Sequence, residues 1–174
     1  MKLIDINPFV RYAMHNRLLS SEYASKSLDN RIFYIEEDGG DVIINGKKYP
    51  VRTNMLILFQ CGTEYLFTNK NVIPAISINF DYTQDKCHIT TPYKIVNAYN
   101  NQEQFSKIHP IEFEDCPPLN SPIIIQDAKW FSDELEKIIS EKAMLTLFKF
   151  NYFCHLKRSY NQNFKVAIYR FCCR

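Results

Sequence analysis

The amino-acid sequence predicts a mainly β protein with α-helices at its C-terminal end, and two observations carry this prediction. First, residues 31–83 form a succession of short segments rich in β-branched and aromatic residues. Second, glycine follows these segments at Asp38-Gly39-Gly40, Asn45-Gly46 and Cys61-Gly62. Such residues tolerate the positive φ of tight turns between antiparallel strands. The pattern therefore predicts a β-meander that forms part of a small barrel.

Size and composition are those of one ordinary globular domain. The chain has 174 residues, of which 46% are hydrophobic and 23% are charged. No apolar run approaches the roughly eighteen residues of a membrane-spanning helix, and Asp5 interrupts the start where a signal peptide is apolar. We therefore expect a cytoplasmic protein with no membrane partner. Its cysteines include no Cys-x-x-Cys pair and are expected to be reduced and structural: Cys61, Cys87, Cys116, Cys154, Cys172 and Cys173.

The net charge of +2 is unevenly distributed. Seven basic residues and no acidic residue lie from Lys142 to the end, so this segment has a charge of +7 and residues 1–141 have a charge of −5. A basic tail is compatible with nucleic-acid contact. The tail carries no helix-turn-helix, zinc-finger or RNP-like signature, however. We therefore expect its charges to solvate a terminal segment.

The elements expected along the chain differ in kind. Residues 1–30 have no sustained period and are expected to form an arm that packs across the barrel. Asn45-Gly46 predicts a hairpin with a type I′ turn, and the continuously apolar residues 55–59 predict a strand covered on both faces. Further strands are expected at residues 31–34, 72–80, 87–91, 111–113 and 122–125, the last three beside or within the proline-rich residues 92–121.

A C-terminal helix is expected to begin near Asp127, which can cap it. Its apolar stripe is our candidate for the interface of a homodimer: Phe131, Leu135, Ile138 and Ile139. Beyond residue 143 apolar residues occur on every side of the expected helix, so a partner subunit or the barrel must bury this part.

Six segments together carry a resemblance to a known family. They are FVRYA at 9–13, RIFY at 31–34, IINGKKY at 43–49, LILF at 56–59, GTEY at 62–65 and ISINFDYT at 76–83. Their order and spacing resemble the cupin-like sensor half of AraC-family transcription regulators, from about residue 7 to residue 141 and most strongly over residues 31–83. The resemblance implies a double-stranded β-helix, or jelly-roll, barrel over residues 1–126 and a helical dimerisation or linker segment over residues 127–174.

Members of this family bind a small effector, dimerise and continue into a half that reads DNA. Two tandem helix-turn-helix motifs need a further domain after residue 141, which residues 142–174 do not supply. We therefore expect contact with DNA only through a domain absent from this chain. The chain is then an excised domain, a truncated regulator or a stand-alone module.

The effector of sugar-responsive members lies inside the barrel, held by an arginine and by histidine or aromatic side chains. In this sequence the position of the arginine falls near Glu37, that of an aromatic residue at Phe67, and those of the later histidine and aromatic residue near Ala75 and Ser77. Only the aromatic character of Phe67 is retained. The resemblance therefore implies a smaller or more apolar effector, or none. The expected pocket residues are Phe33, Glu37, Met55, Phe67, Ala75 and Ser77.

An enzyme is the competing class. Metal-dependent cupins need two histidines and a glutamate that converge from neighbouring strands, whereas residues 31–67 contain no His-x-His pair. Adjacent residues such as Cys87 and His88 point to opposite faces of a strand and cannot pair. We therefore expect no metal, no cofactor and no catalytic residue. A stand-alone cupin acting as an enzyme or carbohydrate binder, and a ligand-free dimerisation domain with a filled barrel, remain the alternatives.

Overall fold

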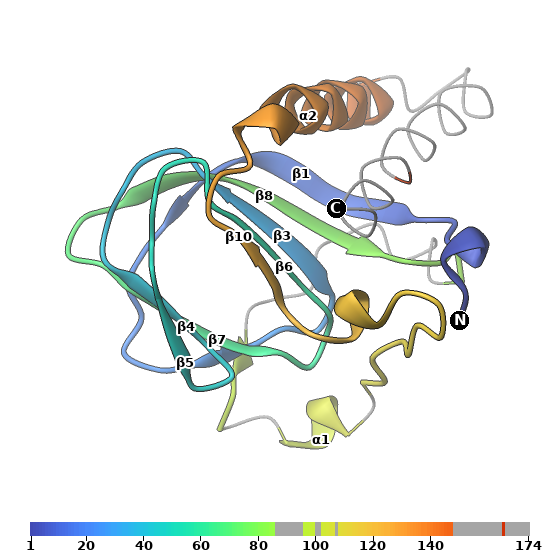
Figure 1. Ribbon diagram of the computed structural model, residues 1–174, viewed down its shortest axis with the longest axis horizontal. Helices are drawn as coiled ribbons and strands as arrows, with labels where there is room; N and C mark the ends of the chain where they lie inside the picture. Colours follow the sequence, from blue (N-terminus) through green and yellow to red (C-terminus); the bar gives the residue numbers. More distant parts are fainter. Residues whose placement is uncertain (86–95, 100–101, 107, 148–164, 166–174) are drawn as a thin grey trace.

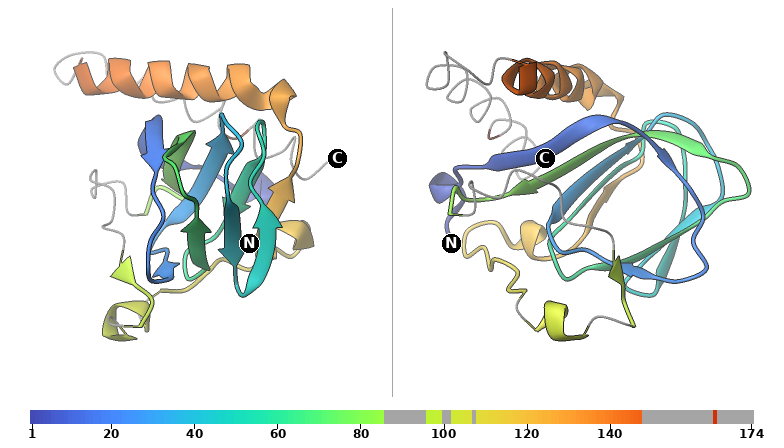
Figure 2. Two further views of the ribbon diagram at one scale, coloured as in Figure 1. Left: turned by 90° about the vertical axis from the view of Figure 1, so that its left-hand side faces the viewer. Right: turned by 180° about the vertical axis from the view of Figure 1, so that it is seen from behind.

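The computed structural model describes residues 1–85, 96–99, 102–106, 108–147 and 165. Over these residues the chain forms two five-stranded antiparallel sheets that face each other as a barrel, and the helix α2 lies along the outside of one sheet (Figures 1 and 2). Sheet A has the order β1-β8-β3-β6-β10 and sheet B the order β5-β4-β7-β2-β9. This architecture confirms the predicted mainly β, cupin-like barrel with a C-terminal helix.

Each sheet includes strands that are far apart along the chain. Sheet A contains β1 (Phe9–Leu18), β3 (Asn30–Ile35), β6 (Leu56–Phe59), β8 (Ile73–Asp81) and β10 (Ile123–Ile125). Sheet B contains β2 (Ser25–Lys26), β4 (Asp41–Ile44), β5 (Lys47–Pro50), β7 (Glu64–Thr68) and β9 (Val96–Asn97). The helices are α1 (Gln102–Phe105) and α2 (Ser132–Leu147), with 3-10 turns η1 (Leu3–Asp5), η2 (Pro117–Asn120) and η3 (Lys129–Phe131).

The predicted hairpin forms between β4 and β5. Asn45 and Gly46 have φ values of 46° and 79°, and Ile44 pairs with Lys47 directly across the turn. This is the two-residue turn with positive φ at both central positions that the sequence predicts. The expected strand at residues 122–125 is confirmed as β10, which pairs with β6.

The N-terminal arm differs from expectation because it contains β1, the longest described strand. β1 pairs with β8 from Phe9 to Leu18 and forms one edge of sheet A. Its first five residues are buried or half-buried and the next four are exposed. Burial therefore changes along the strand rather than alternating from residue to residue, and the period-two signal of a half-buried strand is missing.

The strand expected at residues 111–113 is wrong, since this segment is irregular. Side-chain amides take the place of a strand partner. Gln60 donates from Nε2 to the carbonyl oxygen of Ile111 at 2.8 Å and accepts from the Ile111 amide at 2.7 Å. Asn120 bonds Phe113 in the same way, at 3.0 and 2.7 Å. The strand expected at residues 87–91 lies outside the described residues, as does the chain after residue 147 apart from residue 165.

Helix α2 packs its apolar stripe on the outer face of sheet A. Phe131, Leu135 and Ile138 are fully buried in the isolated chain, in one cluster with Tyr34 and Ile76 of the barrel. Ile139 is half-buried against the same cluster. This corrects the expectation that the stripe forms an interface between two subunits, because three of its four side chains are already covered by their own chain. Lys129 donates its amide to Asp127 Oδ1 at 3.3 Å, but the N-cap residue of η3 is Ala128 and α2 begins at Ser132, so Asp127 is not the expected cap.

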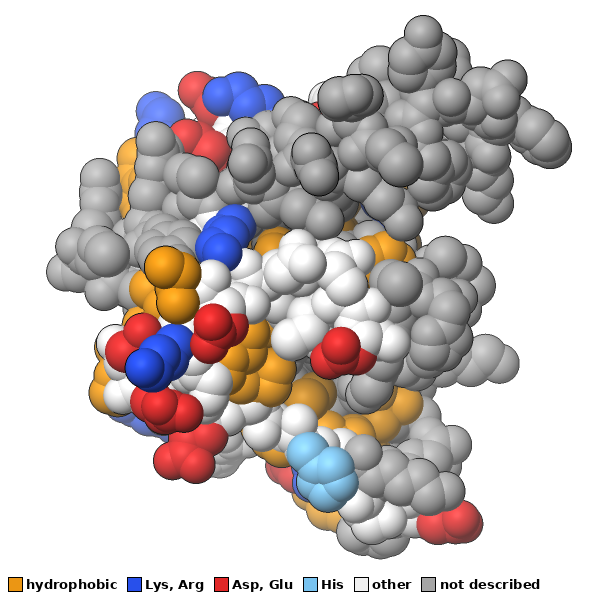
Figure 3. Space-filling model, turned by 90° about the vertical axis from the view of Figure 1, so that its right-hand side faces the viewer, with side chains coloured by type: hydrophobic (Ala, Val, Ile, Leu, Met, Phe, Trp, Pro, Cys, Tyr) orange, Lys and Arg blue, Asp and Glu red, His pale blue; other side chains and the backbone are white. Residues whose placement is uncertain are grey.

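The described surface carries charges of both signs. On the face drawn in Figure 3, acidic and basic side chains lie close together among apolar ones. Within the described residues, no helix has the length and apolar character needed to cross a membrane.

Candidate functional site

A cavity of about 530 Å³ lies inside the barrel, between the two sheets. This volume is in the range of small-molecule sites, roughly 300–1,000 Å³. Its described lining combines hydroxyl, amide, guanidinium and apolar side chains: Tyr12, Asn16, Arg17, Leu18, Leu19, Ser20, Ser21, Ser25, Arg31, Phe33, Tyr65, Leu66, Phe67, Ser77 and Asn79. Residues 19–21 and Arg17 are exposed and therefore form the rim.

The register of β3 and β8 explains why only one half of the barrel is open. The inward positions of β3 are Arg31, Phe33 and Ile35, and they pair with Asn79, Ser77 and Ala75 of β8. At the Ile35 end the interior is filled by apolar side chains, which include Val42, Ile44, Val51, Met55, Ile57 and Ile73. At the Arg31 end the inward residues are polar, and the cavity lies there.

Four buried residues form a hydrogen-bonded group at this end, the polar cluster: Asp29, Arg31, Tyr65 and Asn79. Arg31 donates from Nε to Asp29 Oδ1 at 2.9 Å and from Nη1 to the Tyr65 hydroxyl at 2.7 Å. Asn79 donates from Nδ2 to Asp29 Oδ2 at 3.1 Å. Asp29 is not part of the cavity lining, whereas the other three residues are. The carboxylate therefore lies behind the cavity wall and holds two of its polar side chains in place.

Aromatic rings form the apolar wall beside the polar cluster. The ring of Phe33 contacts those of Phe67, Tyr65 and Phe59, with centroid distances of 5.5, 5.8 and 5.9 Å. The contact with Phe67 is edge-to-face, a favoured geometry for aromatic pairs. Rings fixed in this way offer a ligand a preformed apolar surface.

The structure brings three of the six expected pocket residues together. Phe33, Phe67 and Ser77 line the cavity. Met55 and Ala75 are fully buried in the filled half of the barrel. Glu37 is exposed in the turn after β3, so the acidic residue at the carried-over arginine position is outside the cavity. The expected pocket is therefore wrong at Met55, Ala75 and Glu37.

The polar cluster was not predicted from the sequence. Arg31 stands two residues before Phe33, and a period of two places both side chains on one face of the strand. A charged side chain on the inward face of an otherwise apolar strand was the available signal. Asn79 shares its face with the expected Ser77 for the same reason. The hydrogen bonds that join Asp29, Arg31, Tyr65 and Asn79 depend on the register between β3, β7 and β8, which the sequence alone does not determine.

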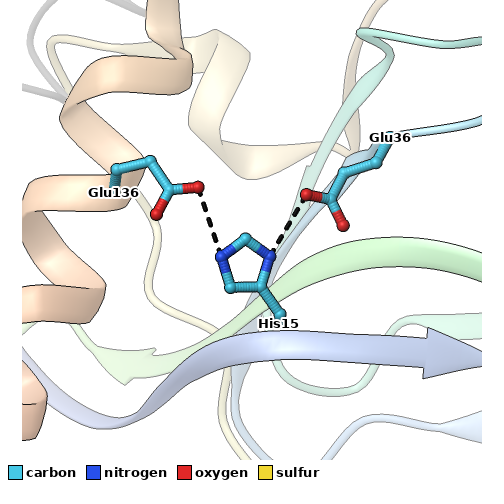
Figure 4. A group of neighbouring side chains, drawn as sticks. All are labelled: His15, Glu36 and Glu136. Atoms are coloured by element: carbon cyan, nitrogen blue, oxygen red, sulfur yellow. Dashed lines mark hydrogen bonds and ion pairs between the residues drawn. The ribbon is translucent and has the colours of Figure 1, made fainter.

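A second cluster joins three elements on the outside of the barrel (Figure 4). His15 of β1 lies with Nδ1 3.1 Å from Glu36 Oε1 and with Nε2 3.3 Å from Glu136 Oε1 of α2. One ring nitrogen and one oxygen of each carboxylate lie within 4.8 Å of one another, but each nitrogen is already within hydrogen-bond distance of a different carboxylate. The arrangement fits a hydrogen-bonded bridge better than a metal site, and the exposed side chains make its contribution small.

Fold and cavity together define a cupin-like β-barrel with an internal space for a small molecule. No protein-family model matches the chain, and no curated protein matches it. Among solved structures, apo ToxT from Vibrio cholerae matches 94% of this chain and 55% of its own, with 10% identity and a TM-score of 0.47. ToxT bound to a methylnaphthalenyl butenoic acid matches 92% of this chain and 55% of its own, with 9% identity and a TM-score of 0.46.

The EutQ protein of Clostridium difficile matches 45% of this chain and 53% of its own, with 19% identity and a TM-score of 0.28. The chain spans about half the length of the ToxT structures that it matches. At these identities the likeness concerns the fold alone, so we base the function on the chain's own residues.

Proposed function

We propose that this chain is the effector-sensing module of an AraC-type transcription regulator, which binds a small molecule in its barrel and does not itself read DNA. The observation that carries the proposal is the cavity of about 530 Å³ at the polar end of β3 and β8. A barrel with a purely structural role fills its interior with side chains. Here the filled half contrasts with the open half, and this supports a binding role over a ligand-free dimerisation domain.

The chemistry of the lining supports binding over catalysis. Its described polar groups are hydroxyls, amides and two guanidinium groups, which recognise a ligand by hydrogen bonds. A metal-dependent cupin enzyme uses imidazole and carboxylate ligands inside the barrel. The histidine of the described barrel that meets carboxylates, His15, points to the outside towards α2.

A route from the cavity to the helix supports the regulatory part of the proposal. β1 lines the cavity with Tyr12, Asn16 and Leu18. The same strand contacts α2 on its other side, where His15 meets Glu136 and Lys142 donates from Nζ to the Val10 carbonyl oxygen at 2.9 Å. An effector that favours one position of β1 therefore also favours one position of α2. A homodimer is part of this proposal, through a surface other than the covered stripe of α2.

A thermal-shift screen with a cavity-filling variant tests the proposal. The probes are sugars, amino acids, acyl compounds and the two kinds of acid found in ToxT structures, an unsaturated fatty acid and a naphthalenyl butenoic acid. A ligand present at 100 times its Kd stabilises the native state by about 2.7 kcal/mol. We expect at least one class of probe to raise the melting temperature of the wild-type chain.

Ser77→Leu is the informative variant because its longer side chain enters the cavity, and Ser140→Leu on the exposed side of α2 is the matched control. The stabilisation should disappear in Ser77→Leu and persist in Ser140→Leu. A complete absence of stabilising probes, or equal stabilisation of both variants, contradicts binding in the barrel.

A further inference from the structure

The polar cluster presents unused hydrogen-bonding atoms to the cavity. Arg31 uses Nε on Asp29 and Nη1 on Tyr65, and no described residue accepts a hydrogen bond from its Nη2. Some polar atoms of the described residues are fully enclosed and lack a partner, but Nη2 is not one of them. It is therefore accessible. Because the Arg31 side chain is only 4% exposed and lines the cavity, Nη2 is reached from the cavity. It offers two N–H donors there.

The side-chain amide of Asn79 offers an acceptor at the same place. Its neighbour Asp29 is a carboxylate and can only accept hydrogen bonds, so the nitrogen of the amide must face it, as observed at 3.1 Å. The oxygen Oδ1 consequently points away from Asp29. No described residue donates to this oxygen, and Asn79 lines the cavity.

Tyr65 adds a second donor. Its hydroxyl oxygen accepts from Arg31 Nη1, and the Ser25 side chain, which lines the same cavity, is a further hydrogen-bonding neighbour that favours the phenolate oxygen as acceptor, so the hydroxyl proton is left to be donated. Burial raises the pKa of Tyr65 above its ordinary value, so the phenol keeps this proton at neutral pH. The polar end of the cavity therefore combines two kinds of donor with one acceptor.

The charge of the cluster decides which head group fits. Asp29 and Arg31 are both buried and neutralise each other, so the cluster has no net charge to offer a ligand. A carboxylate placed there would be a buried charge without a counterion and would also face Asn79 Oδ1. An ammonium group would find no acidic side chain in the described lining. The other arginine of the lining, Arg17, is exposed at the rim, where water already solvates an anion.

We propose that the effector of this barrel has an uncharged polar head, an alcohol or a primary amide, on an apolar body. The oxygen of the head accepts from Arg31 Nη2 and the Tyr65 hydroxyl, and its O–H or N–H donates to Asn79 Oδ1. The body lies against the rings of Phe33 and Phe67. This inference rests on the proposed function, since it specifies the ligand of the same cavity.

Four probes with one body and different heads test the inference on the full chain by isothermal titration calorimetry at neutral pH. They are decanol, decanamide, decanoate and decylamine. We expect decanol and decanamide to bind about tenfold more tightly than decanoate and decylamine, because only their heads satisfy the donors and the acceptor without adding a charge. Stronger binding of decanoate or of decylamine overturns the inference and leaves the proposed function standing.

The variant Tyr65→Phe removes one donor, and Tyr49→Phe on the edge strand β5 is the matched control outside the cavity lining. The affinity for decanol should fall about fivefold in Tyr65→Phe and stay unchanged in Tyr49→Phe. An equal loss in both variants, or none in Tyr65→Phe, overturns the role of Tyr65. Should Tyr65→Phe melt before the titration, the order of the four heads on the wild-type chain decides alone. Failure of all four probes overturns the inference, and the broad screen then decides the proposed function separately.

Discussion

Asp29 and Arg31 form an ion pair inside the barrel, with 2.9 Å between Oδ1 and Nε and with side-chain exposures of 0% and 4%. They stand two residues apart, at the start of β3, and the arginine faces the cavity while the carboxylate lies behind its wall. Removing charges from water is costly, so each partner depends on the other. This pair sets the electrostatics of the site and makes the stability of the barrel sensitive to it.

We predict that Asp29→Asn destabilises the chain by about 3–5 kcal/mol, because it leaves the Arg31 guanidinium buried without a counterion. Urea unfolding followed by circular dichroism measures the effect. The control Asp41→Asn breaks an exposed pair with Lys48 at 2.9 Å, which should contribute about 0–1 kcal/mol. A similar small loss for both variants would show that water reaches the Asp29–Arg31 pair and screens it.

Two glycines with positive φ allow a matched test of backbone packing. Gly40 has a φ of 63°, and an added Cβ would overlap the Thr68 carbonyl oxygen and approach Asn69 Cα to 2.7 Å. Gly46 has a φ of 79°, and its added Cβ would meet no atom within 4 Å. Gly46→Ala should cost about 1–2 kcal/mol from the left-handed conformation alone. Gly40→Ala should cost about 1–3 kcal/mol more, because the backbone of β7 and the following turn must move.

Melting temperatures of the two glycine variants, measured under identical conditions, give the comparison directly. Equal losses would mean that the end of β7 moves away from residue 40 without a cost in stability.

Local chemistry accounts for what could be predicted from the sequence. Asn45-Gly46 specifies its turn by backbone preference, and alternation from Ile32 onward specifies strands. The predicted position of Phe33 and Phe67 in the cavity follows from the same alternation. β1 was not predicted, because the burial of its residues changes along its length instead of alternating.

Long-range relationships account for the rest. The apolar stripe of α2 shows that one face of the helix must be covered, but not whether a second subunit or the outer face of sheet A covers it. Likewise, Asp29 and Asn79 are 50 residues apart and meet only through the pairing of β3 with β8. The His15 bridge to Glu136 joins residues separated by most of the described chain, and no local pattern indicates it.

The position of α2 predicts the outcome of truncating its stripe. Leu135→Ala should destabilise the chain by about 2–5 kcal/mol, since it leaves a cavity in the core between α2 and sheet A. Lys137→Ala, on the exposed face of the same helix, should change stability by less than about 0.5 kcal/mol. Light scattering should give the same oligomeric state for both variants. If folded Leu135→Ala had a different mass from the wild type, the apolar stripe of α2 would form an interface between subunits after all.

Asp38 provides a test in acid. The amide and hydroxyl of Thr53 donate to its Oδ1 at 2.6 and 2.7 Å, and these hydrogen bonds lower the pKa of Asp38 below its ordinary value. A carboxyl group with a lowered pKa in the folded state adds stability above its unfolded pKa and loses it as the pH falls through the folded value. The stabilisation of the turn between β3 and β4 by Asp38 should therefore be complete at neutral pH and decline from about pH 4 downward.

Comparing wild type with Asp38→Asn between about pH 7 and pH 2 isolates this contribution. The urea midpoint of the wild type should exceed that of the variant at neutral pH, and the difference should shrink steadily as acid protonates Asp38. Glu37→Gln serves as the control, because Glu37 lies exposed in the same turn and makes no hydrogen bond to the described residues. A difference between wild type and Asp38→Asn that stays constant down to the lowest pH would mean that Thr53 bonds the neutral amide as well as it bonds the carboxylate.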